Sequence, residues 1–332
     1  MIRSKRFTRR DALSAIASTF GSATLPFGAL AQTAYPERRI TVILPYPGGG
    51  IVDILTRLIM DNVAEAWKQT ITVDPKPGAN GNIAWDQVAR AEPDGYTLTF
   101  FSPGTIANPR MQPGLRWSEK SFVPVGIAVW APSAVVVHPS VPVTTMAEFV
   151  DYVKKNPGKL NWANPGIGTS QHLNTAILIH ATKMEMVEVA YKGQPPGIQD
   201  LMANRVQLKV ASIGLVSEHV KAGALKALAV LGKTRSALLP NVPTMTEAGF
   251  AEVNVVPWYG YCAPKGTPPP TVDKINRAIA NALKDPKVRA ALEGQGLQPV
   301  EPMTTAELAQ LVEADTQKYA KVIQDANIRI GN

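Results

Sequence analysis

Two glycine-rich segments, one in each half of the chain, have residues that could bind an anion. They are Pro47–Asp53 and Gly166–His172, and each follows a short strand-like run and precedes a helix-like run. Glycine lets backbone amides approach a ligand closely, and the N-terminus of the following helix adds partial positive charge. Two such loops facing each other would bind a carboxylate without Lys or Arg. For either loop taken alone, an ordinary turn is the competing interpretation.

Residue patterns of enzymes and metal sites are missing from the sequence. Neither loop is a P-loop or a G-x-G-x-x-G fingerprint, and neither G-x-S-x-G nor H-E-x-x-H occurs. Asp53 and Asp200 lie near predicted helix starts, where a carboxylate usually acts as a cap. We expect no cofactor and no metal, because metal-ligand spacing is absent among His138, His172, His180 and His219. His172 is the one histidine placed to meet a ligand, with a structural hydrogen bond as the alternative.

The first 31 residues have the pattern of an export signal. Five basic residues precede an uncharged, mildly apolar run that ends in Ala29-Leu30-Ala31, the small-x-small pattern of a signal peptidase site. We therefore predict cleavage before Gln32 and a periplasmic location. Arg9-Arg10 resembles a twin-arginine signal, although an ordinary basic leader explains it equally well. The run is too poor in Leu and Ile for a permanent anchor, so we expect no embedding in the membrane.

The charge and the cysteine content argue against a nucleic-acid-binding protein and against a fold held by disulfides. Removing the leader subtracts five basic residues and one acidic residue, which lowers the net charge from +8 to +4. No cluster of Lys and Arg interleaved with aromatic residues is present, so nucleic acid is not an expected partner. Cys262 is the single cysteine, which rules out an intrachain disulfide. It lies in a strand-like run, and we expect a packed, inert thiol there.

The hydrophobic periodicity predicts strands alternating with helices, and hence an α/β fold with a mainly parallel sheet. Expected strands are 40–44, 71–73, 96–100, 134–137, 160–163, 187–189 and 206–211. Expected helices are 51–63, 83–91, 145–155, 171–182, 196–204, 270–284, 286–293 and 304–326. Thr145 and Glu148 resemble a capping box at the start of one of these helices. The order strand, glycine-rich loop, helix occurs once in each half of the chain.

A series of short motifs resembles the Bug-type periplasmic receptors of tripartite tricarboxylate transporters. The resemblance covers essentially the whole chain after the leader, in order and with normal spacing. The motifs are 35–40, 45–50 with Asp53 and Arg57, 76–81, 93–98, 164–173, 191–193, 228–230, 240–249 and 263–268. Each of these nine motifs alone is a weak signal, but nine in sequence are a strong one.

The resemblance implies a type II periplasmic-binding-protein fold, with two lobes, a ligand cleft between them and two chain crossovers. We place the crossovers at about Pro132–Ala134 and Val253–Trp258. The predicted domains are then the signal peptide (1–31), a discontinuous lobe 1 (32–133 and 254–332) and lobe 2 (134–253). The C-terminal helices are expected to pack back onto lobe 1, and we expect a monomer.

The resemblance also implies which residues contact the ligand, since both lobes hold one ligand carboxylate through their loops. From the first loop these are Tyr46, Gly48, Gly49, Gly50, Ile51 and Asp53. From the second they are Gly168, Thr169, Ser170, Gln171 and His172, and two other segments add Thr105 and Ser212. Departures from the family pattern place a phenol at Tyr46 and the small pair Ala211-Ser212 on the wall. These departures favour a bulkier or flatter ligand than a short aliphatic diacid, such as an aromatic carboxylate.

The leading functional prediction is a periplasmic solute-binding receptor that closes around a small organic carboxylate. The resemblance implies delivery of this ligand to membrane transporter subunits. An alternative from another class is a sensor that presents its ligand to a two-component signalling system. An exported α/β enzyme is a third possibility, for which the sequence offers no nucleophile and base pair.

Overall fold

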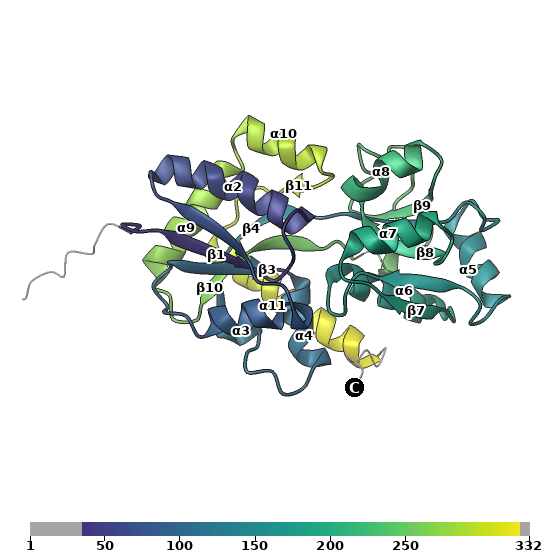
Figure 1. The fold of residues 1–332 in the computed structure, drawn as a ribbon, viewed down its shortest axis with the longest axis horizontal. Helices are drawn as coiled ribbons and strands as arrows, with labels where there is room; N and C mark the ends of the chain where they lie inside the picture. Colours follow the sequence, from purple (N-terminus) through teal and green to yellow (C-terminus); the bar gives the residue numbers. More distant parts are fainter. Residues whose placement is uncertain (1–34, 254, 326–332) are drawn as a thin grey trace, which may run out of the picture. The chain divides into compact units, whose positions relative to one another are not determined.

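The computed structural model describes residues 35–253 and 255–325. Residue contacts divide the chain into two units, Met1–Glu37 and Arg38–Asn332, and all features below belong to the second unit. The predicted signal peptide and its cleavage site lie outside the described residues. The second unit contains two β-sheets, each with its own helices (Figure 1).

Sheet A has the strand order β11-β4-β10-β3-β1-β2. Its strands are β1 (Ile40–Leu44), β2 (Ile71–Pro75), β3 (Thr97–Phe101), β4 (Phe122–Trp130), β10 (Trp258–Pro264) and β11 (Gln298–Pro299). The helices of this part are α2 (Ile51–Trp67), α3 (Asn82–Ala89), α4 (Pro103–Met111), α9 (Pro269–Ala282), α10 (Pro286–Gly294) and α11 (Thr305–Asp325), with the 3-10 turns η1 (Ala79–Gly81) and η2 (Glu119–Ser121). We call sheet A with these helices lobe 1.

Sheet B has the strand order β7-β6-β8-β5-β9. Its strands are β5 (Ser133–Val137), β6 (Asn161–Asn164), β7 (Val187–Ala190), β8 (Leu208–Ser212) and β9 (Lys226–Leu231). Its helices are α5 (Met146–Lys154), α6 (Ser170–Thr182), α7 (Gln194–Met202) and α8 (Ile213–Lys221), and the 3-10 turn η3 (Ala251–Val253) follows later in the chain. We call sheet B with these helices lobe 2. The predicted two-lobed α/β architecture is confirmed.

Both sheets are mixed, so the prediction of a mainly parallel sheet was wrong. Strands β1, β2 and β3 are parallel in sheet A, as are β6, β7 and β8 in sheet B. The strands next to the crossovers pair antiparallel: β10 with β3 and β4, and β5 with β8 and β9. The chain enters the second sheet directly from β4, without the crossover helix that parallel neighbours require.

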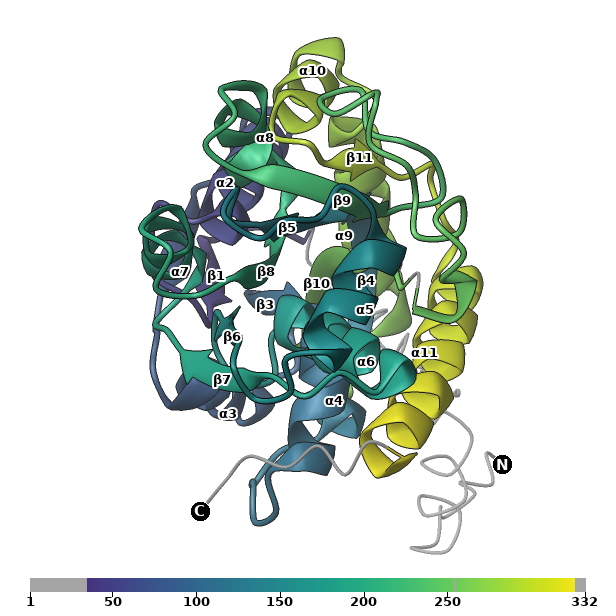
Figure 2. The same cartoon turned by 90° about the vertical axis from the view of Figure 1, so that its right-hand side faces the viewer.

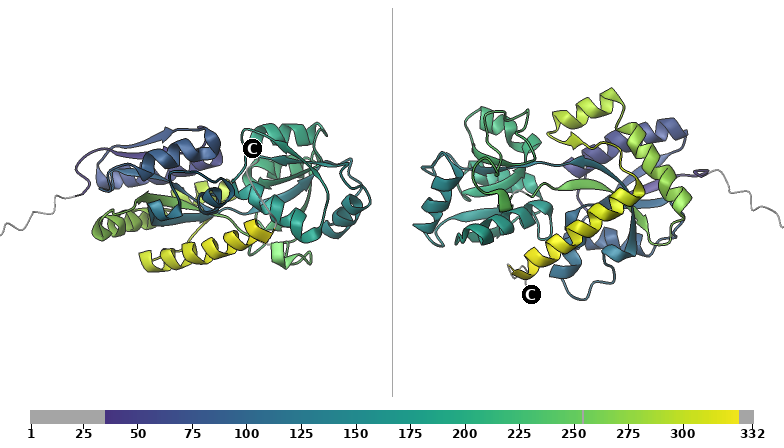
Figure 3. Two further views of the ribbon diagram at one scale, coloured as in Figure 1. Left: turned by 90° about the horizontal axis from the view of Figure 1, so that it is seen from below. Right: turned by 180° about the vertical axis from the view of Figure 1, so that it is seen from behind.

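The chain passes between the sheets on two adjacent segments. The first joins β4 to β5 through Ala131 and Pro132, and the second returns from β9 to β10. The Ala131 N–H donates to the Pro257 carbonyl oxygen at 2.8 Å, so the two connections run side by side. The exact lobe boundaries stay a prediction. Helices α9 and α11 pack on β4 of lobe 1, and Figure 3 shows α11 in yellow. The second half of α11 also adds Tyr319 and Ile323 to an apolar cluster of sheet B.

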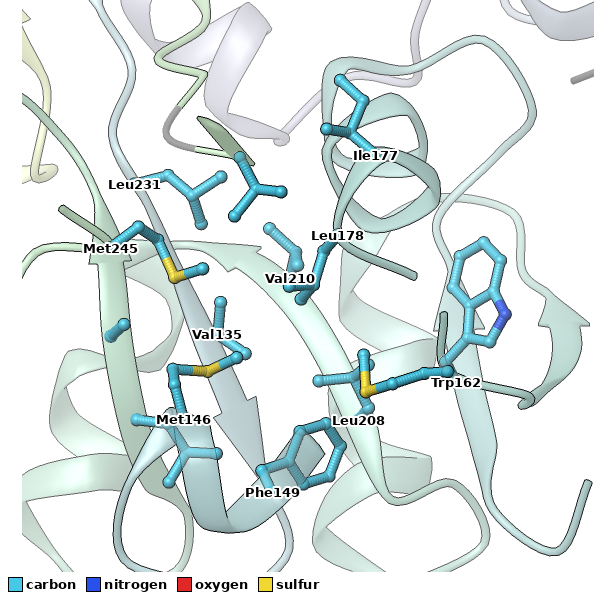
Figure 4. Close-up of a cluster of buried hydrophobic side chains, with 14 of the residues drawn as sticks. Val135, Met146, Phe149, Trp162, Ile177, Leu178, Leu208, Val210, Leu231 and Met245 are labelled. Carbon is cyan, nitrogen blue, oxygen red and sulfur yellow. The ribbon is translucent and has the colours of Figure 1, made fainter. Parts of the chain in front are cut away.

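Sheet B separates two apolar clusters, and Figure 2 shows α5 and α6 on one side of its strands and α7 and α8 on the other. On one face, α5 and α6 cover a cluster that includes Val135, Phe149, Leu178, Leu208 and Val210 (Figure 4). On the other face, α7 and α8 cover Ala134, Ala163 and Ala211. Because side chains alternate along a strand, β8 sends Leu208 and Val210 to one face and Lys209 and Ala211 to the other.

Several elements had no predicted counterpart. Strands β4 and β9 and helices α4 and α8 were not among the predicted elements. Helix α4 begins with Pro103 and Gly104 and contains Pro109, which are residues that favour turns. A capping box between Ser102 and Thr105 starts the helix all the same. The predicted capping box of Thr145 and Glu148 is confirmed.

Candidate ligand-binding site

A carboxylate inside the following helix closes the first glycine-rich loop. Gly49, which adopts a φ of +78°, donates its N–H to Asp53 Oδ2 at 2.9 Å. Arg57 donates from Nε to Asp53 Oδ1 at 3.0 Å, one turn further along α2. Asp53 therefore holds the loop against its own helix, as the capping interpretation predicted. Its contact with a ligand stays a prediction.

These bonds keep Asp53 ionised. Burial raises the pKa of this carboxyl, but the hydrogen bonds from Arg57 and Gly49 and the charge of Arg57 outweigh it, so the net pKa is lowered. Gly48, Gly49 and Gly50 are exposed, whereas Ile51 is buried as the first residue of α2. Gly50 is the N-cap and supplies no side-chain cap. The first-turn amides of α2 thus lack the usual side-chain acceptor, which makes them suitable for an anion.

The second loop is fixed by its own side chains. Gly166 donates its N–H to Asn164 Oδ1 at 2.9 Å, and Thr169 Oγ1 donates to the Gly166 carbonyl oxygen at 2.8 Å. Thr169 is also the N-cap of α6, where its Oγ1 accepts the His172 N–H at 3.2 Å. Gly168 has a φ of +82° and is buried. This loop is therefore held in shape by side chains of Asn164, Thr169 and His172.

His172 is a buried, uncharged part of this loop. Its Nδ1 accepts the Gly168 N–H at 3.3 Å, and its ring stacks on Trp162 with centroids 6.0 Å apart. Burial lowers the pKa of His172 to about 4, so the imidazole is neutral near pH 7. An Nδ1 that accepts a hydrogen bond leaves the proton on Nε2. The structural hydrogen bond considered from the sequence is present, and contact between His172 and a ligand stays a prediction.

A largely buried group of polar side chains joins the starts of three helices of lobe 2 to a strand of lobe 1. Gln171 donates from Nε2 to Tyr259 Oη at 3.1 Å and to Ser212 Oγ at 3.4 Å. Gln194 donates from Nε2 to Ser212 Oγ at 2.9 Å, and Ser212 donates its N–H to Gln194 Oε1 at 2.9 Å. We call Gln171, Gln194, Ser212 and Tyr259 the amide–hydroxyl cluster. It lies at the N-termini of α6, α7 and α8.

A row of aromatic rings connects the first loop to this cluster. The Tyr46 and Phe100 ring centroids are 5.8 Å apart, and those of Phe100 and Tyr259 are 5.2 Å apart. Tyr46 also meets Trp85 edge to face at 6.4 Å. Burial raises the pKa of Tyr46 and of Tyr259, so both phenols are neutral. Loop one and the amide–hydroxyl cluster thus belong to one region of the molecule.

Helix α4 of lobe 1 approaches the second loop closely. A Cβ atom added to Gly104 would lie 2.5 Å from the Gly168 carbonyl oxygen, so only glycine fits there. Asn174 of α6 donates from Nδ2 to the Val255 carbonyl oxygen at 3.1 Å. Thr105 is fully buried in the first turn of α4, and its Oγ1 accepts the Ser102 N–H at 3.2 Å. The hydroxyl of Thr105 therefore caps α4, and its contact with a ligand stays a prediction.

The structure brings together most of the predicted residues and adds two. Ser170 is buried as the first residue of α6. Gln194 and Tyr259 were missed, although Gln194 directly follows the motif Tyr191-Lys192-Gly193 and its position could have been inferred. Asp200 lies in the second half of α7, where it binds Tyr191 and Arg205, so its predicted place near a helix start was wrong.

The chemistry available here is hydrogen bonding with partial charges. Arg57 is the one Lys or Arg with an interaction to a predicted site residue among the described residues. The same part of the chain contains no group of three His, Cys, Asp or Glu side chains able to hold a metal ion. None of its helices is both long and apolar enough to cross a bilayer. Cys262 is buried in β10, and burial raises the pKa of its thiol, as expected for an inert residue.

Comparison with known proteins identifies the family. Residues 55–328 match the "Tripartite tricarboxylate transporter family receptor" family. The chain belongs to this receptor family. Protein BugT of Bordetella pertussis is 30% identical over 299 residues, which cover 89% of this chain and 91% of that protein. The predicted Bug-type relationship is confirmed.

Two solved structures of family relatives contain ligands. Rpa4515 of R. palustris with adipate is 30% identical, with a TM-score of 0.81, and the match covers 89% of this chain and 99% of that one. MatC (Rpa3494) from Rhodopseudomonas palustris with bound malate is 31% identical, with a TM-score of 0.80 and coverage of 87% and 100%. This receptor therefore shares its whole fold with proteins that were solved with dicarboxylates.

Proposed function

We propose that this receptor binds a small organic carboxylate between its two lobes in the periplasm and delivers it to the membrane subunits of a transporter. The observation that carries the proposal is the amide–hydroxyl cluster at the N-termini of α6, α7 and α8. Helix N-termini carry partial positive charge, and their first amides bind anions. The adipate and malate in the two relatives support a carboxylate as this anion.

The first loop supplies a second set of donors from lobe 1. Gly48, Gly49 and Gly50 are exposed, and Gly50 leaves the start of α2 without a side-chain cap. Asp53 fixes this loop from the inside, so its backbone amides are held in place before a ligand arrives. A carboxylate bound by amides from both lobes would draw them together. We therefore assign recognition to fixed dipoles of both lobes.

The paired crossovers support a hinge. Ala131 and Pro257 lie on the two connections and share a hydrogen bond, so bending at this point would move one lobe against the other. Closure changes the surface that the receptor presents, and a membrane transporter can select the ligand-bound form by that change. Delivery to such a carrier is supported by the family to which the chain belongs.

A thermal-shift screen of the mature receptor tests ligand class. The panel contains malate, adipate and hexanoate as aliphatic acids, benzoate and terephthalate as aromatic acids, and adipamide as an uncharged match for adipate. We expect at least one carboxylate to raise Tm, with about 2.7 kcal/mol of stabilisation at a hundredfold excess over Kd. Stabilisation by short aliphatic acids alone contradicts the aromatic preference. Adipamide that stabilises as well as adipate contradicts anion binding.

Delivery is tested with membrane extract from the source organism. The ligand-loaded receptor is expected to retain the large membrane subunit of a tripartite transporter, identified by mass spectrometry, and the ligand-free receptor is expected to retain much less. Equal retention of both forms contradicts recognition of the closed state. Retention of a sensor kinase in place of a carrier supports the signalling alternative.

A further inference from the structure

A lysine is buried inside lobe 2 without a hydrogen-bond partner among the described residues. Lys209 lies in the middle of β8, its relative exposure is 0%, and its Nζ has no hydrogen-bond partner within the part of the chain that the structure describes. It projects to the face of sheet B that α7 and α8 cover, opposite Leu208 and Val210. Buried ammonium groups are almost always paired, so this one requires an explanation.

The immediate surroundings of Lys209 are apolar. A Cβ atom added to Gly197 of α7 would lie 3.2 Å from Lys209 Nζ, 3.2 Å from Ala163 Cβ and 3.3 Å from Tyr191 Cδ2. The glycine therefore makes room for the amino group beneath α7. On the neighbouring strand β5, Val136 pairs with Lys209. A methionine would fill this space without the cost of burying a charge.

The charged groups of the surrounding elements are occupied elsewhere. On α7, Asp200 accepts hydrogen bonds from Tyr191 Oη and Arg205, each at 2.8 Å. On β7, Glu188 pairs with Trp162, which belongs to the opposite face of the sheet, and accepts a hydrogen bond from Asn164. On α8, the charged residues Glu218, His219 and Lys221 lie in the second half of the helix.

No carboxylate on β5 or β6 faces the amino group either, because neither strand contains one. Within the described residues, no Asp or Glu oxygen lies within 4.0 Å of Lys209 Nζ. Burial lowers the pKa of Lys209 to about 7. The free amine and the ammonium ion therefore have similar populations at neutral pH.

Lys209 lies directly behind the amide–hydroxyl cluster. Strand β8 runs from Leu208 to Ser212, which belongs to the cluster, and Lys209 is three residues earlier, about 10 Å along the strand. Helix α7 begins at Gln194, another member, and Gly197 above Lys209 Nζ is three residues further on, about 4.5 Å along the helix. A charge at this depth acts on the cluster through protein rather than through water, so it is only weakly screened.

We propose that Lys209 is a buried countercharge for the ligand, which takes up a proton when an anion binds at the amide–hydroxyl cluster without touching that anion. The inference rests on the proposed function, because it requires an anionic ligand at this cluster. An anion near the cluster favours the ammonium form of Lys209, and by linkage the ammonium form favours the anion equally. A dianion gains more from this charge than a monoanion does.

Calorimetry at pH 8 tests the coupling between ligand binding and proton uptake by Lys209. Binding enthalpies are measured in buffers of different ionisation enthalpy, with adipate and hexanoate as probes, or terephthalate and benzoate if the receptor prefers aromatic acids. The wild-type receptor is expected to take up close to one proton per dicarboxylate. In Lys209→Met this uptake disappears, and the affinity for the dicarboxylate falls about tenfold, with a smaller loss for the monocarboxylate. The matched control is Lys154→Met, an exposed lysine on α5, which changes neither quantity.

The outcomes separate this inference from the proposed function. Binding without proton uptake, or unchanged uptake in Lys209→Met, overturns the coupling and leaves carboxylate binding intact. If no carboxylate binds the wild-type receptor, the proposed function fails and the coupling fails with it. Thermal unfolding of the ligand-free receptor gives a separate check, because the pKa of Lys209 is lower in the folded state than in the unfolded chain. Lys209→Met is expected to raise Tm at pH 6, with a smaller gain at pH 10; an equal Tm at pH 6 contradicts an uncompensated buried amine.

Discussion

The two glycine-rich loops have the same order of elements but differ in burial and in the charge of the side chain that holds them. In lobe 1, Gly48 to Gly50 are exposed, and Asp53, the third residue of the following helix, accepts the Gly49 N–H. In lobe 2, Gly168 is buried, and His172, the third residue of its helix, accepts the Gly168 N–H, while Thr169 bonds to Gly166. The first loop depends on an ionised carboxylate, and the second on a neutral imidazole.

This difference indicates a division of roles between the lobes. Loop two packs on α4 of lobe 1 through the contact of Gly104 with Gly168, so its geometry matters for the approach of the lobes. Loop one has exposed amides and an uncapped helix start, so it suits the capture of a ligand from water. Among the described residues, no Lys or Arg is a hydrogen-bond partner of the amide–hydroxyl cluster, which agrees with the proposal that backbone dipoles of both loops recognise the ligand.

Gly104→Val is expected to have the largest effect, because it blocks the contact between α4 and loop two. The added Cβ would lie 2.5 Å from the Gly168 carbonyl oxygen, and backbone cannot yield as a side chain does. If binding requires this approach, the affinity for the best carboxylate falls by about 1000-fold, near 4 kcal/mol, as measured by calorimetry.

The control is Gly294→Ala, since a Cβ atom at Gly294 would have no heavy atom within 4 Å. This variant is expected to keep its affinity. The free energy of unfolding of Gly104→Val without ligand is measured alongside, because α4 also packs on the core of lobe 2 through Ala107 and Met111. Full affinity in Gly104→Val would show that this close approach is not needed for binding.

His172 should make loop two sensitive to acid. Its folded-state pKa of about 4 lies below the unfolded value of about 6.5, so the unfolded chain binds the proton first as the pH falls. The stability from this group is therefore constant above about pH 6.5 and decreases towards pH 4, by about 3 kcal/mol in total. Urea unfolding of wild type and His172→Gln at pH 4, 5 and 7 measures the difference.

His180→Gln is the matched control, because this histidine is exposed on the same helix. Its unfolding is expected to follow the wild type at each pH. A His172→Gln profile that declines as steeply as the wild type would mean that the buried imidazole does not set the acid stability of loop two.

Asp53→Asn tests the role of this carboxylate in holding loop one. The substitution keeps the shape of the side chain but removes the charge that binds Arg57, and we expect a loss of about 1.5 kcal/mol in the free energy of unfolding at pH 7. Because the folded-state pKa of Asp53 is lowered, its stabilisation is present above the unfolded pKa and is lost as the pH falls through the folded pKa. The free energies of unfolding of Asp53→Asn and wild type should therefore become equal in acid.

Asp61→Asn, at an exposed position of the same helix, is the control and should leave stability unchanged. Equal stability of Asp53→Asn and wild type at pH 7 would contradict the anchoring role of this carboxylate.

Local patterns in the sequence could predict the two loops, but not the residues from distant parts of the chain that contact them. The strand, glycine-rich loop and helix around Gly49 and Gly168 are visible because glycine and periodicity are local signals. Tyr259 reaches Gln171 across 88 positions, and no local pattern encodes that contact. That Lys209 has no hydrogen-bond partner within residues 35–253 and 255–325 is likewise a property of packing, since only the fold shows which charges lie near it.

The mixed sheets were missed for a similar reason. Strand β4 and the short connection after Trp130 enter the second sheet without a helix, and periodicity alone does not give the direction of the next strand. Helix α4 was missed because Pro103 and Gly104 resemble a turn, and its capping box outweighs them only once Ser102 and Thr105 are seen to pair.

Tyr46→Phe is expected to have the smallest effect and shows whether loop one contributes a side chain. The ring packs against Trp85 and Phe100, and phenylalanine keeps both contacts, so the free energy of unfolding should change by less than about 0.5 kcal/mol. A neutral phenol can donate one hydrogen bond to a carboxylate, and its loss should weaken binding about fivefold. Tyr152→Phe, in α5 of lobe 2, serves as the control in the same calorimetric titration. Unchanged affinity in Tyr46→Phe would mean that loop one binds the ligand through its backbone amides alone. Loop one would then differ from loop two, which has many polar side chains.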